Sequence, residues 1–314
     1  MIEIPTGELT DLLGVTPQRI NAIIKQLDIP KGDISRVGRS KPFSPSAIKT
    51  ILSHRGLNYD TRETMAFCNN KGGEGKTSVA VNTAHKLASL GFKVLLVDAD
   101  PQGNASSYML GDSEYAHILH DIVNEKCTAR EAIVTIEETL SILPSGLANE
   151  QLSTELSQKK VNHSTYFKDL FKDLDFNFIV WDLSPSLSML NYMALLSCDR
   201  VNIVTTLTTF GVQGVEMTYS LIEQAKKNYK EFNPTCVALV NKFDSRTTSG
   251  FRHLSDISDD VGVELATTMI RVDNSVTRSQ ADGVMLKGNS NAYKDICNFV
   301  NSIVGIKPDV KSVQ

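Results

Sequence analysis

The sequence predicts an α/β protein with a doubly wound, mostly parallel sheet and a small N-terminal α-helical module. Continuous runs of Val, Ile and Leu alternate with helical segments, as expected for parallel strands covered by helices on both faces. A glycine-rich loop joins one such strand to a helix, and the first 55 residues follow a different pattern. The length of 314 residues suits a core of about 250 residues plus a small module.

The larger unit is predicted over residues 65–306, followed by a short tail at 307–314. Its strands are expected at Met65–Asn69, Lys93–Asp98, Leu140–Leu143, Phe178–Asp182, Val201–Thr205 and Thr235–Val240, with a further short strand near Thr267–Ile270. Its helices are expected at Thr77–Leu90, over much of 113–136 and 150–174, at Gly214–Tyr229 and at Ala292–Val304. The last helix carries few basic residues, which favours docking on the core over membrane binding.

Residues 1–55 predict a winged helix-turn-helix domain, joined to the larger unit by a polar linker at 56–64. A short helix ends at Gly14, and Thr16-Pro17 provides a cap and a first-turn proline for a second helix, which runs to about Leu27. Two helices joined by a tight turn outline a helix-turn-helix. A stretch with Gly and Pro follows as a candidate wing, and Ser44-Pro45 is expected to cap a third helix.

Basic residues outnumber acidic ones in this module, opposite to the balance of the whole chain. A second helix of this kind enters the major groove of DNA, and a wing contacts the backbone or the minor groove. The candidate DNA contacts are Gln18, Arg19 and Lys25 on the second helix and Arg39 and Lys41 on the wing. The alternative is a helix pair that serves only dimerisation.

Composition limits the other functions. The net charge of −4 gives no global sign of nucleic-acid binding, so DNA contacts require local basic patches. The five cysteines are widely spaced without a C-x-x-C pair, which argues against zinc or an iron–sulfur cluster and fits a reducing cytosol. The chain has no recognisable signal peptide and no apolar run near 18 residues. We therefore expect a cytoplasmic protein with no membrane contact.

The strongest motif is the loop Lys71-Gly-Gly-Glu-Gly-Lys-Thr-Ser78, which follows a strand and opens a helix. Glycines let main-chain amides approach phosphate oxygens, and the helix N-terminus favours negative charge. Lys76 is expected to reach the β- and γ-phosphates, and the Thr77 hydroxyl to ligate Mg²⁺. The first glycine of the general P-loop pattern falls on Asn70, and the match is to the deviant Walker A pattern. The nucleotide-binding candidates are Gly72, Gly73, Glu74, Gly75, Lys76, Thr77 and Ser78.

Two acidic motifs follow predicted strands. Asp98 and Asp100 end one strand, and Asp182 ends another, where ligands of open α/β sheets bind. Isolated aspartates there are usually caps or turn formers, but beside a phosphate loop a catalytic role is favoured. We expect Asp182 to act on the metal largely through water, Asp98 to support the metal and loop, and Asp100 to orient the hydrolytic water.

Together the phosphate loop, the Asp98-Ala-Asp-Pro-Gln-Gly-Asn104 motif and the Asp182 strand end resemble the ParA family of partition ATPases, within the ParA/MinD group. The resemblance spans most of residues 65–305 and implies a deviant Walker P-loop NTPase that uses ATP and Mg²⁺. It implies an ATP-dependent homodimer in which catalytic Lys71 crosses to the partner's phosphates, beside catalytic Lys76 and Asp100.

The same resemblance implies that the protein moves a plasmid or chromosome cargo in a cycle of ATP binding and hydrolysis. The ATP-bound dimer is expected to bind DNA nonspecifically, and a ParB-like centromere-binding protein is expected to stimulate hydrolysis and release the dimer. The N-terminal module resembles an extension that binds operator DNA and represses its own operon. A nucleoid-associated location follows from these properties.

Other candidate sites follow the last long strand. Asn241 and Lys242 resemble a base-contacting element of MinD-like proteins, and a simple turn asparagine is the equal alternative. Arg252, Arg271 and Arg278 are candidates for nonspecific DNA contacts, against ordinary solvated surface.

The chain departs from the family pattern in two places. A single proline, Pro185, follows the Asp182 motif where relatives commonly have two. Glu74 places a negative side chain in the phosphate loop, and we expect it to point outward because it would otherwise oppose phosphate.

Two other functions compete with partition. One is a MinD-like positioning ATPase for a protein or membrane-bound cargo. The other is a transcriptional repressor with a degenerate nucleotide site, which the intact Lys76, Thr77, Asp100 and Asp182 disfavour.

Overall fold

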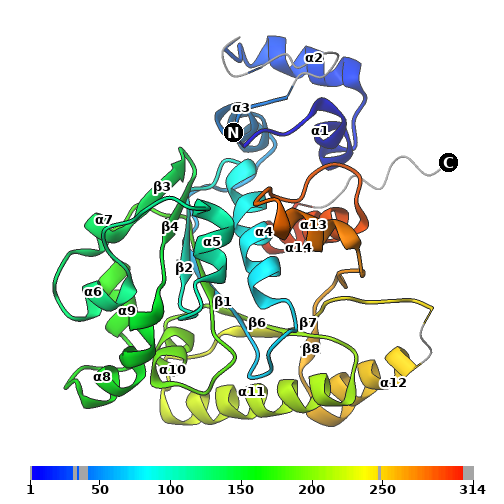
Figure 1. Ribbon diagram of the computed structural model, residues 1–314. Coiled ribbons are helices and arrows are strands. Elements are labelled where there is room, and N and C mark those ends of the chain that lie inside the picture. Colours follow the sequence, from blue (N-terminus) through cyan, green and yellow to red (C-terminus); the bar gives the residue numbers. More distant parts are fainter. Residues whose placement is uncertain (1, 31–33, 35–41, 247–248, 307–314) are drawn as a thin grey trace.

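The computed structural model describes residues 2–30, 34, 42–246 and 249–306 (Figure 1). The strands are β1 (Glu63–Cys68), β2 (Val94–Asp98), β3 (Val134–Glu137), β4 (Leu140–Leu143), β5 (Phe178–Asp182), β6 (Arg200–Thr205), β7 (Thr235–Val240) and β8 (Glu264–Leu265). The larger helices are α1 (Thr6–Leu13), α2 (Pro17–Gln26), α3 (Pro45–His54), α4 (Lys76–Ser89), α10 (Met189–Leu196), α11 (Thr209–Asn228), α13 (Asn274–Ala281) and α14 (Asn291–Val304). The shorter ones are α5 (Asn104–Leu110), α6 (Leu119–Val123), α7 (Ala129–Ala132), η2 (Leu147–Gln151), α8 (Leu152–Gln158), α9 (Tyr166–Phe171), α12 (Ser249–Ser255) and η3 (Asp256–Val261).

The strands form one sheet in the order β3-β4-β2-β5-β1-β6-β7-β8. Every neighbouring pair is parallel except β3 and β4, which pair antiparallel at the edge. Because the central strands are parallel, their carboxyl ends meet at one edge of the sheet. The register places Asp98 at the end of β2 directly beside Asp182 at the end of β5. The predicted α/β class with a mostly parallel sheet is confirmed.

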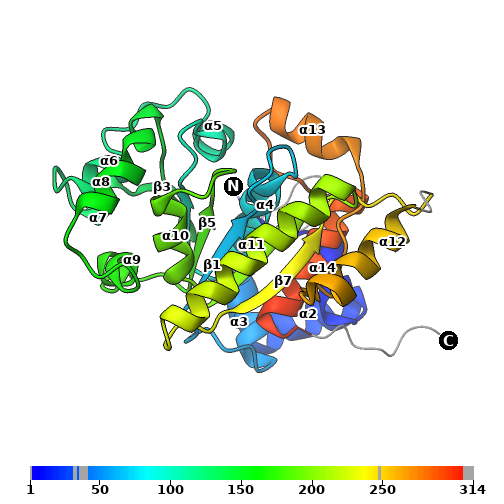
Figure 2. The ribbon, with the colours of Figure 1, turned by 90° about the horizontal axis from the view of Figure 1, so that it is seen from below.

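Helices cover both faces of the sheet (Figures 1 and 2). One apolar cluster joins α4, α5 and α14 to side chains such as Phe67 and Val180, and α4 and α14 lie side by side. The other cluster joins α6 to α11 to the opposite face, around the fully buried Trp181. Strands covered on both sides are largely apolar, which explains the nearly continuous Val, Ile and Leu runs.

The sequence analysis differs from the structure at both edges of the sheet. No strand was predicted at β3, whose residues are only partly buried and carry a weak local signal. The expected strand at Thr267–Ile270 is absent, and the last parallel strand is Glu264–Leu265, which pairs with β7. Beyond it, Ile270 N–H donates to the Val240 carbonyl and Arg271 makes one isolated bridge with Phe243, too few pairings for a strand.

The helical predictions at 113–136 and 150–174 resolve into short segments, α6 and α7 and then η2, α8 and α9. The helix that starts at Thr209 begins five residues before the predicted Gly214. The Thr208 hydroxyl caps it by accepting from Gly211 N–H at 3.1 Å.

The N-terminal residues form three helices, capped as expected. The Thr16 hydroxyl accepts from Arg19 N–H, and Ser44 caps α3 by accepting from Ala47 N–H. Ile34 and Phe43 form an antiparallel bridge that flanks the predicted wing. The wing candidates Arg39 and Lys41 lie outside the described residues, as does the predicted tail.

This module packs directly on the larger unit. A Cβ atom on Gly91, which follows α4 with φ +91°, would lie 2.7 Å from the Pro45 carbonyl oxygen and from Lys49 Cβ on α3. In the segment predicted as a linker, the Tyr59 hydroxyl donates to the Leu90 carbonyl at 2.6 Å, and β1 already begins at Glu63. Residues 56–64 are therefore tied to the core by specific contacts.

Candidate functional site

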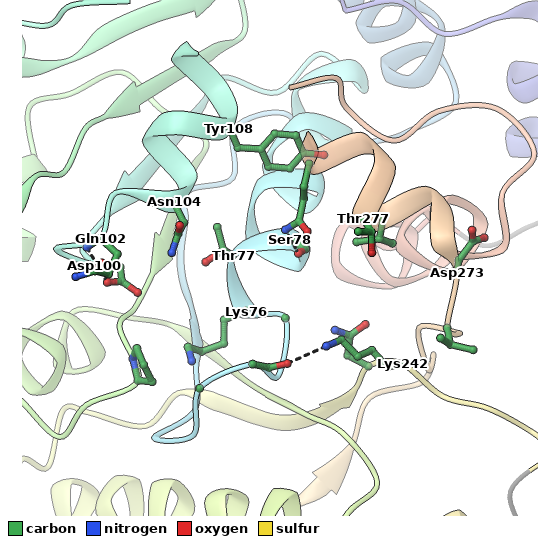
Figure 3. A pocket seen from close by; sticks show the side chains of 18 of the residues that line it. Lys76, Thr77, Ser78, Asp100, Gln102, Asn104, Tyr108, Lys242, Asp273 and Thr277 are labelled. Atoms are coloured by element: carbon green, nitrogen blue, oxygen red, sulfur yellow. Dashed lines mark hydrogen bonds between the residues drawn. The ribbon is translucent and has the colours of Figure 1, made fainter. Parts of the chain in front are cut away.

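A pocket of about 830 Å³ opens at the carboxyl edge of the sheet (Figure 3). Its walls come from the phosphate loop, the segment after β2, the residues after β7, and α13. The lining residues are Gly72, Gly73, Gly75, Lys76, Thr77, Ser78, Asp100, Gln102, Asn104, Ser107, Tyr108, Pro185, Asn241, Lys242, Arg271, Val272, Asp273, Asn274, Val276, Thr277 and Gln280. The cavity has the position expected for a ligand of an open α/β sheet.

The phosphate loop takes a conformation that requires glycine. Gly73 and Gly75 have φ values of +81° and +90°, and α4 begins directly after Gly75. A Cβ on Gly75 would lie 2.2 Å from Asn241 Nδ2, so a side chain there is excluded by space as well as by backbone angle. The first amides of α4 have no partner within the helix and face the pocket, which makes the loop an anion site.

Lys76 is the basic group of this anion site. Its side chain is only 7% exposed, and Nζ donates to the Lys71 carbonyl at 3.0 Å. Burial lowers the pKa of Lys76, while the negative charges of Asp182 and Asp100 oppose that shift. An ammonium held by one main-chain carbonyl beside an open cavity has donors left for a phosphate.

The Glu74 side chain corrects one expectation. It does not line the pocket, so it avoids phosphate as expected, but it turns inward and is 1% exposed. Its Oε1 pairs with Lys71 Nζ at 2.6 Å, and its Oε2 accepts from Thr206 N–H at 2.5 Å. The carboxylate therefore links the phosphate loop to the segment after β6.

Asp98 is held by the protein itself. Its Oδ2 accepts from the Ser106 amide at 2.8 Å and the Ser106 hydroxyl at 2.7 Å, and its Oδ1 accepts from Asp100 N–H. Burial raises the pKa of Asp98 to about 6, against the lowering effect of these hydrogen bonds. Asp98 therefore braces the turn that carries Asp100.

Asp182 has the opposite environment. It is fully buried, and neither carboxylate oxygen has a hydrogen-bond partner with regular geometry among the described residues. Burial, followed by the charge of neighbouring Asp98, raises the pKa of Asp182 well above its usual value, while Thr77 and Lys76 oppose the rise. A buried carboxylate without a partner is costly, so this site suits a bound cation.

Asp100 stands at the pocket wall, 9% exposed, in the loop between β2 and α5 (Figure 3). Its Oδ1 accepts from Gln102 N–H at 3.0 Å, and its carbonyl accepts from the Ser145 hydroxyl. These bonds fix the loop, and Asp100 faces the cavity with Thr77 opposite. A carboxylate placed in this way can accept a proton from a water molecule or position it.

The residues after β7 hold the phosphate loop from the other side. Asn241 Nδ2 donates to the Glu74 carbonyl at 2.8 Å, and Lys242 Nζ donates to the Gly73 carbonyl at 2.9 Å (Figure 3). Lys242 has a positive φ of 54°, unusual for a residue with a side chain. The structure therefore assigns both residues a contact with the loop backbone, in addition to their place in the pocket wall.

The α13 wall was missed in the sequence reasoning. Gln280 Nε2 donates to the Ser78 hydroxyl at 2.6 Å, across 202 residues of chain, and Tyr108 contacts the Ser279 hydroxyl of α13. The segment has no glycine-rich or acidic motif, so only the tertiary fold shows that it faces the phosphate loop. Gln102 and Asn104, by contrast, follow Asp100 directly, and that spacing marks them as pocket residues.

The arginine candidates separate into two groups. Arg271 makes a bidentate pair with Asp295 on α14 at 2.7 and 2.8 Å, and it also lines the pocket. Arg252 and Arg278 are exposed on α12 and α13. On α2, Gln18, Arg19 and Lys25 are exposed opposite the buried Ile20 and Ile23.

The donor set fits magnesium. No group of three or more His, Cys, Asp or Glu side chains that could hold a metal occurs among the described residues. Mg²⁺ characteristically keeps several waters and takes one or two protein oxygens plus substrate phosphates. The Thr77 hydroxyl and the unpartnered Asp182 provide such a partial set. The fold and the site together define a P-loop nucleotide-binding protein.

Comparison with known proteins narrows the class of P-loop protein to one family. A family model described as an AAA domain matches residues 62–234. The virulence plasmid ParA family protein pGP5-D of Chlamydia trachomatis is 30% identical, over 77% of this chain and 94% of its own length. The chromosome partitioning protein ParA of Caulobacter vibrioides is 30% identical over 52% of this chain and 62% of its own length.

Among solved structures, the complex of a Cyanothece McdA variant with ATP is similar in fold. It gives a TM-score of 0.71 at 19% identity, covering 80% of this chain and 99% of that chain. The chain belongs to the ParA family of ATPases, which confirms the predicted resemblance.

In the part of the chain that the structure describes, no helix combines the length and the apolar character that a membrane crossing requires.

Proposed function

We propose that the protein is a DNA-partition ATPase whose ATP-bound dimer binds DNA and whose hydrolysis releases it. The observation that carries the proposal is the pocket itself. An anion site of glycine-loop amides and Lys76 lies beside Asp182, a buried carboxylate without a partner among the described residues. A triphosphate with its metal ion satisfies both groups at once.

Within one subunit, the loop amides from Gly72 to Ser78 and the Lys76 ammonium bind the phosphates. Thr77 and Asp182, with Asp98 behind them, hold Mg²⁺, which when bound neutralises charge on the phosphate oxygens. Asp100 positions the attacking water, because it lines the cavity and its loop is fixed by Ser145. Asn241 and Lys242 support the loop and border the base end of the pocket.

Lys71 acts on the nucleotide of a second subunit. It does not line the pocket of its own chain, and its side chain is 33% exposed at the outer edge of the loop. Exposed apolar side chains on neighbouring segments are Leu187 at 58%, Phe210 at 69% and Met217 at 51%. Met217 contacts Asn70, next to Lys71, and an exposed apolar surface beside the loop suits a contact with a second copy. A lysine delivered from there would neutralise charge as an arginine finger does.

DNA binding uses exposed basic side chains on two parts of the molecule. Arg252 and Arg278, with Arg271 held by Asp295, serve nonspecific contacts in the dimer. The α2 residues Gln18, Arg19 and Lys25, with the wing, serve operator DNA and autorepression. A ParB-like partner stimulates hydrolysis, and the cycle takes place on the nucleoid in the cytoplasm. The helix α14 carries few basic residues, and the N-terminal module suits DNA, so DNA is favoured over a membrane as the surface to which the ATP-bound dimer binds.

Sedimentation and DNA binding with ADP, ATP and a slowly hydrolysed analogue test this proposal. The expected result is a monomer with ADP, and with ATP or the analogue a dimer that coats nonspecific DNA. Vesicles of anionic lipid serve as the alternative surface and are expected to show no ATP-dependent binding. Equal assembly and equal DNA affinity with all three nucleotides would overturn the proposed switch, and ATP-dependent vesicle binding would favour a MinD-like positioning ATPase.

A further inference from the structure

The phosphate loop contains a charged group that nucleotide binding does not use. Glu74 is 1% exposed, although its loop neighbours Gly72 and Gly73 are exposed. A carboxylate that is buried to this degree is retained only when it is paired and hydrogen-bonded. Its partners therefore indicate what it does.

Both oxygens of Glu74 are engaged on the side away from the cavity. Oε2 accepts from Thr206 N–H in the segment between β6 and α11, which anchors the carboxylate to the core. Oε1 pairs with Lys71 Nζ at 2.6 Å. The same ammonium lies 3.4 Å from the Thr208 hydroxyl, which caps α11. The Lys71 side chain is thus held against its own subunit by the Glu74 carboxylate and the Thr208 hydroxyl.

We propose that Glu74 is a positioning residue that holds Lys71 in its own subunit and so sets the ATP concentration at which the dimer forms. The inference rests on the proposed function, in which Lys71 acts on the partner's phosphates. An ammonium paired with Glu74 is already neutralised and is held by groups of its own subunit. Lys71 must leave this ion pair before it can cross the interface, and loss of the pair opposes dimer formation.

The anchor on Thr206 explains why the pair must break. A flexible carboxylate would follow the lysine to a new position, but Glu74 is buried, and its second oxygen is held by a main-chain amide. The Glu74 carbonyl also accepts from Asn241 Nδ2, which fixes the residue at both its main chain and its side chain. Glu74 therefore stays in place when Lys71 departs.

The test is the ATP concentration that gives half-maximal dimer in sedimentation, for wild type, Glu74→Gln and Lys71→Ala. The glutamine keeps an oxygen for Thr206 N–H and removes the charge that retains Lys71. We expect Glu74→Gln to need roughly two- to fivefold less ATP, the size of effect from losing one partly exposed ion pair. Any gain in its ADP affinity is expected to be smaller than the fall in the ATP requirement, because loss of the Glu74 charge near Lys76 favours both nucleotides alike, whereas release of Lys71 favours only the dimer.

Glu223→Gln is the matched control. Glu223 pairs with Lys226 at 2.9 Å with the same three-residue spacing, in the second half of α11. Loss of that pair is expected to leave the ATP requirement unchanged. An unchanged or higher requirement in Glu74→Gln, or an equal gain in ADP affinity, would overturn the role of Glu74. Lys71→Ala that dimerises like wild type would instead overturn the trans role of Lys71 and with it the proposed function.

A second measurement needs no variant and covers a Glu74→Gln protein that fails to fold. Acylation of lysines in the nucleotide-free wild type is followed by mass spectrometry, with the exposed Lys25 and Lys230 as internal references. We expect Lys71 to react several-fold more slowly than both, because its ammonium is held as the ion-paired cation. Reaction at the same rate as the references would show that Lys71 is not retained, and the inference would be wrong.

Discussion

The two ends of α4 each carry a buried lysine, and the two lysines have different surroundings. Lys86, near the C-terminal end, is 1% exposed; it pairs with Glu8 Oε1 at 2.5 Å and lies 5.9 Å from the centre of the Tyr293 ring. The Tyr293 hydroxyl also donates to Glu8, so this cluster is complete within the protein. Lys76, at the N-terminal end, has one main-chain carbonyl and an open cavity.

The difference separates a structural lysine from a ligand-binding one. Lys86 joins α1 of the N-terminal module to α4 and α14, and its charge is balanced inside the fold. Lys76 keeps unused donors beside Asp182, a carboxylate without a regular hydrogen-bond partner among the described residues, so this end of α4 has groups left for a ligand and its metal ion. Burial alone does not distinguish them, whereas the completeness of their partners does.

The largest expected effect is on ATP binding at the N-terminal end of α4, where Lys76 lines the pocket. Lys76→Ala removes the lysine ammonium that faces the cavity from the phosphate loop, and the neighbouring Lys242 is already bound to the Gly73 carbonyl. ATP affinity is expected to fall by at least about a hundredfold, the loss typical of several charge-assisted hydrogen bonds. The free energy of unfolding without nucleotide is expected to change little, because the loss of a desolvated charge is offset by the loss of its attraction to Asp182 and Asp100. Calorimetric titration and thermal unfolding measure the two quantities, and a folded variant that binds ATP normally would contradict the assignment.

At the C-terminal end of α4, where Lys86 pairs with Glu8, the expected effect is on the free energy of unfolding. Lys86→Ala leaves the Glu8 carboxylate without its ion-pair partner, so the free energy of unfolding is expected to fall by about 3 kcal/mol. ATP affinity is expected to change little. Lys93→Ala is the control, because Lys93 pairs with Asp175 on the exposed surface and its loss should cost less than about 0.5 kcal/mol. Denaturant unfolding of the three proteins checks this, and equal stability losses would show that burial of the Lys86 pair has no special value.

Asp182→Asn tests the same comparison through the buried carboxylate that lies near Lys76. Without nucleotide, removal of a buried negative charge that has no regular hydrogen-bond partner among the described residues is expected to raise the free energy of unfolding by about 1–2 kcal/mol at neutral pH. Addition of Mg²⁺ and ATP is expected to stabilise the wild type much more than the variant. Thermal unfolding with and without Mg²⁺-ATP measures both changes. A variant that is destabilised without ligand would mean that Asp182 has a structural partner after all.

The smallest expected effect concerns His85, next to Lys86. Burial, then the charge of Lys86, lowers the pKa of His85 to about 4. Below about pH 6.5 the unfolded chain therefore binds a proton that the folded chain does not, and the free energy of unfolding falls as the pH drops from 6.5 towards 4. His85→Gln is expected to remove about 1 kcal/mol of that loss at pH 6. Denaturant unfolding at pH 7.5 and pH 6 checks the difference, and parallel pH dependence in both proteins would exclude a role for His85.

Local patterns were sufficient to predict the central sheet and the position of the phosphate loop in the pocket wall. The strand at Phe178–Asp182, the helix after the phosphate loop and the caps at Thr16 and Ser44 depend on neighbouring residues, so the sequence displays them. The α13 wall and the Lys86–Glu8 pair depend on contacts across many residues, and neither leaves a local signal. Glu74 shows the limit most clearly, because its inward turn follows from Thr206 and Lys71 and not from the motif.

The central claim is that Lys71 completes the site of the partner subunit, and mixed dimers test it most directly. Lys71→Ala retains its own pocket but lacks the lysine that crosses, whereas Asp100→Ala donates Lys71 but cannot position water. Each variant alone is expected to hydrolyse ATP at a background rate. An equimolar mixture should recover a substantial part of the wild-type rate, because one of the two sites in a mixed dimer then has both Lys71 and Asp100. A mixture that remains as inactive as either variant would show that Lys71 does not act across the interface.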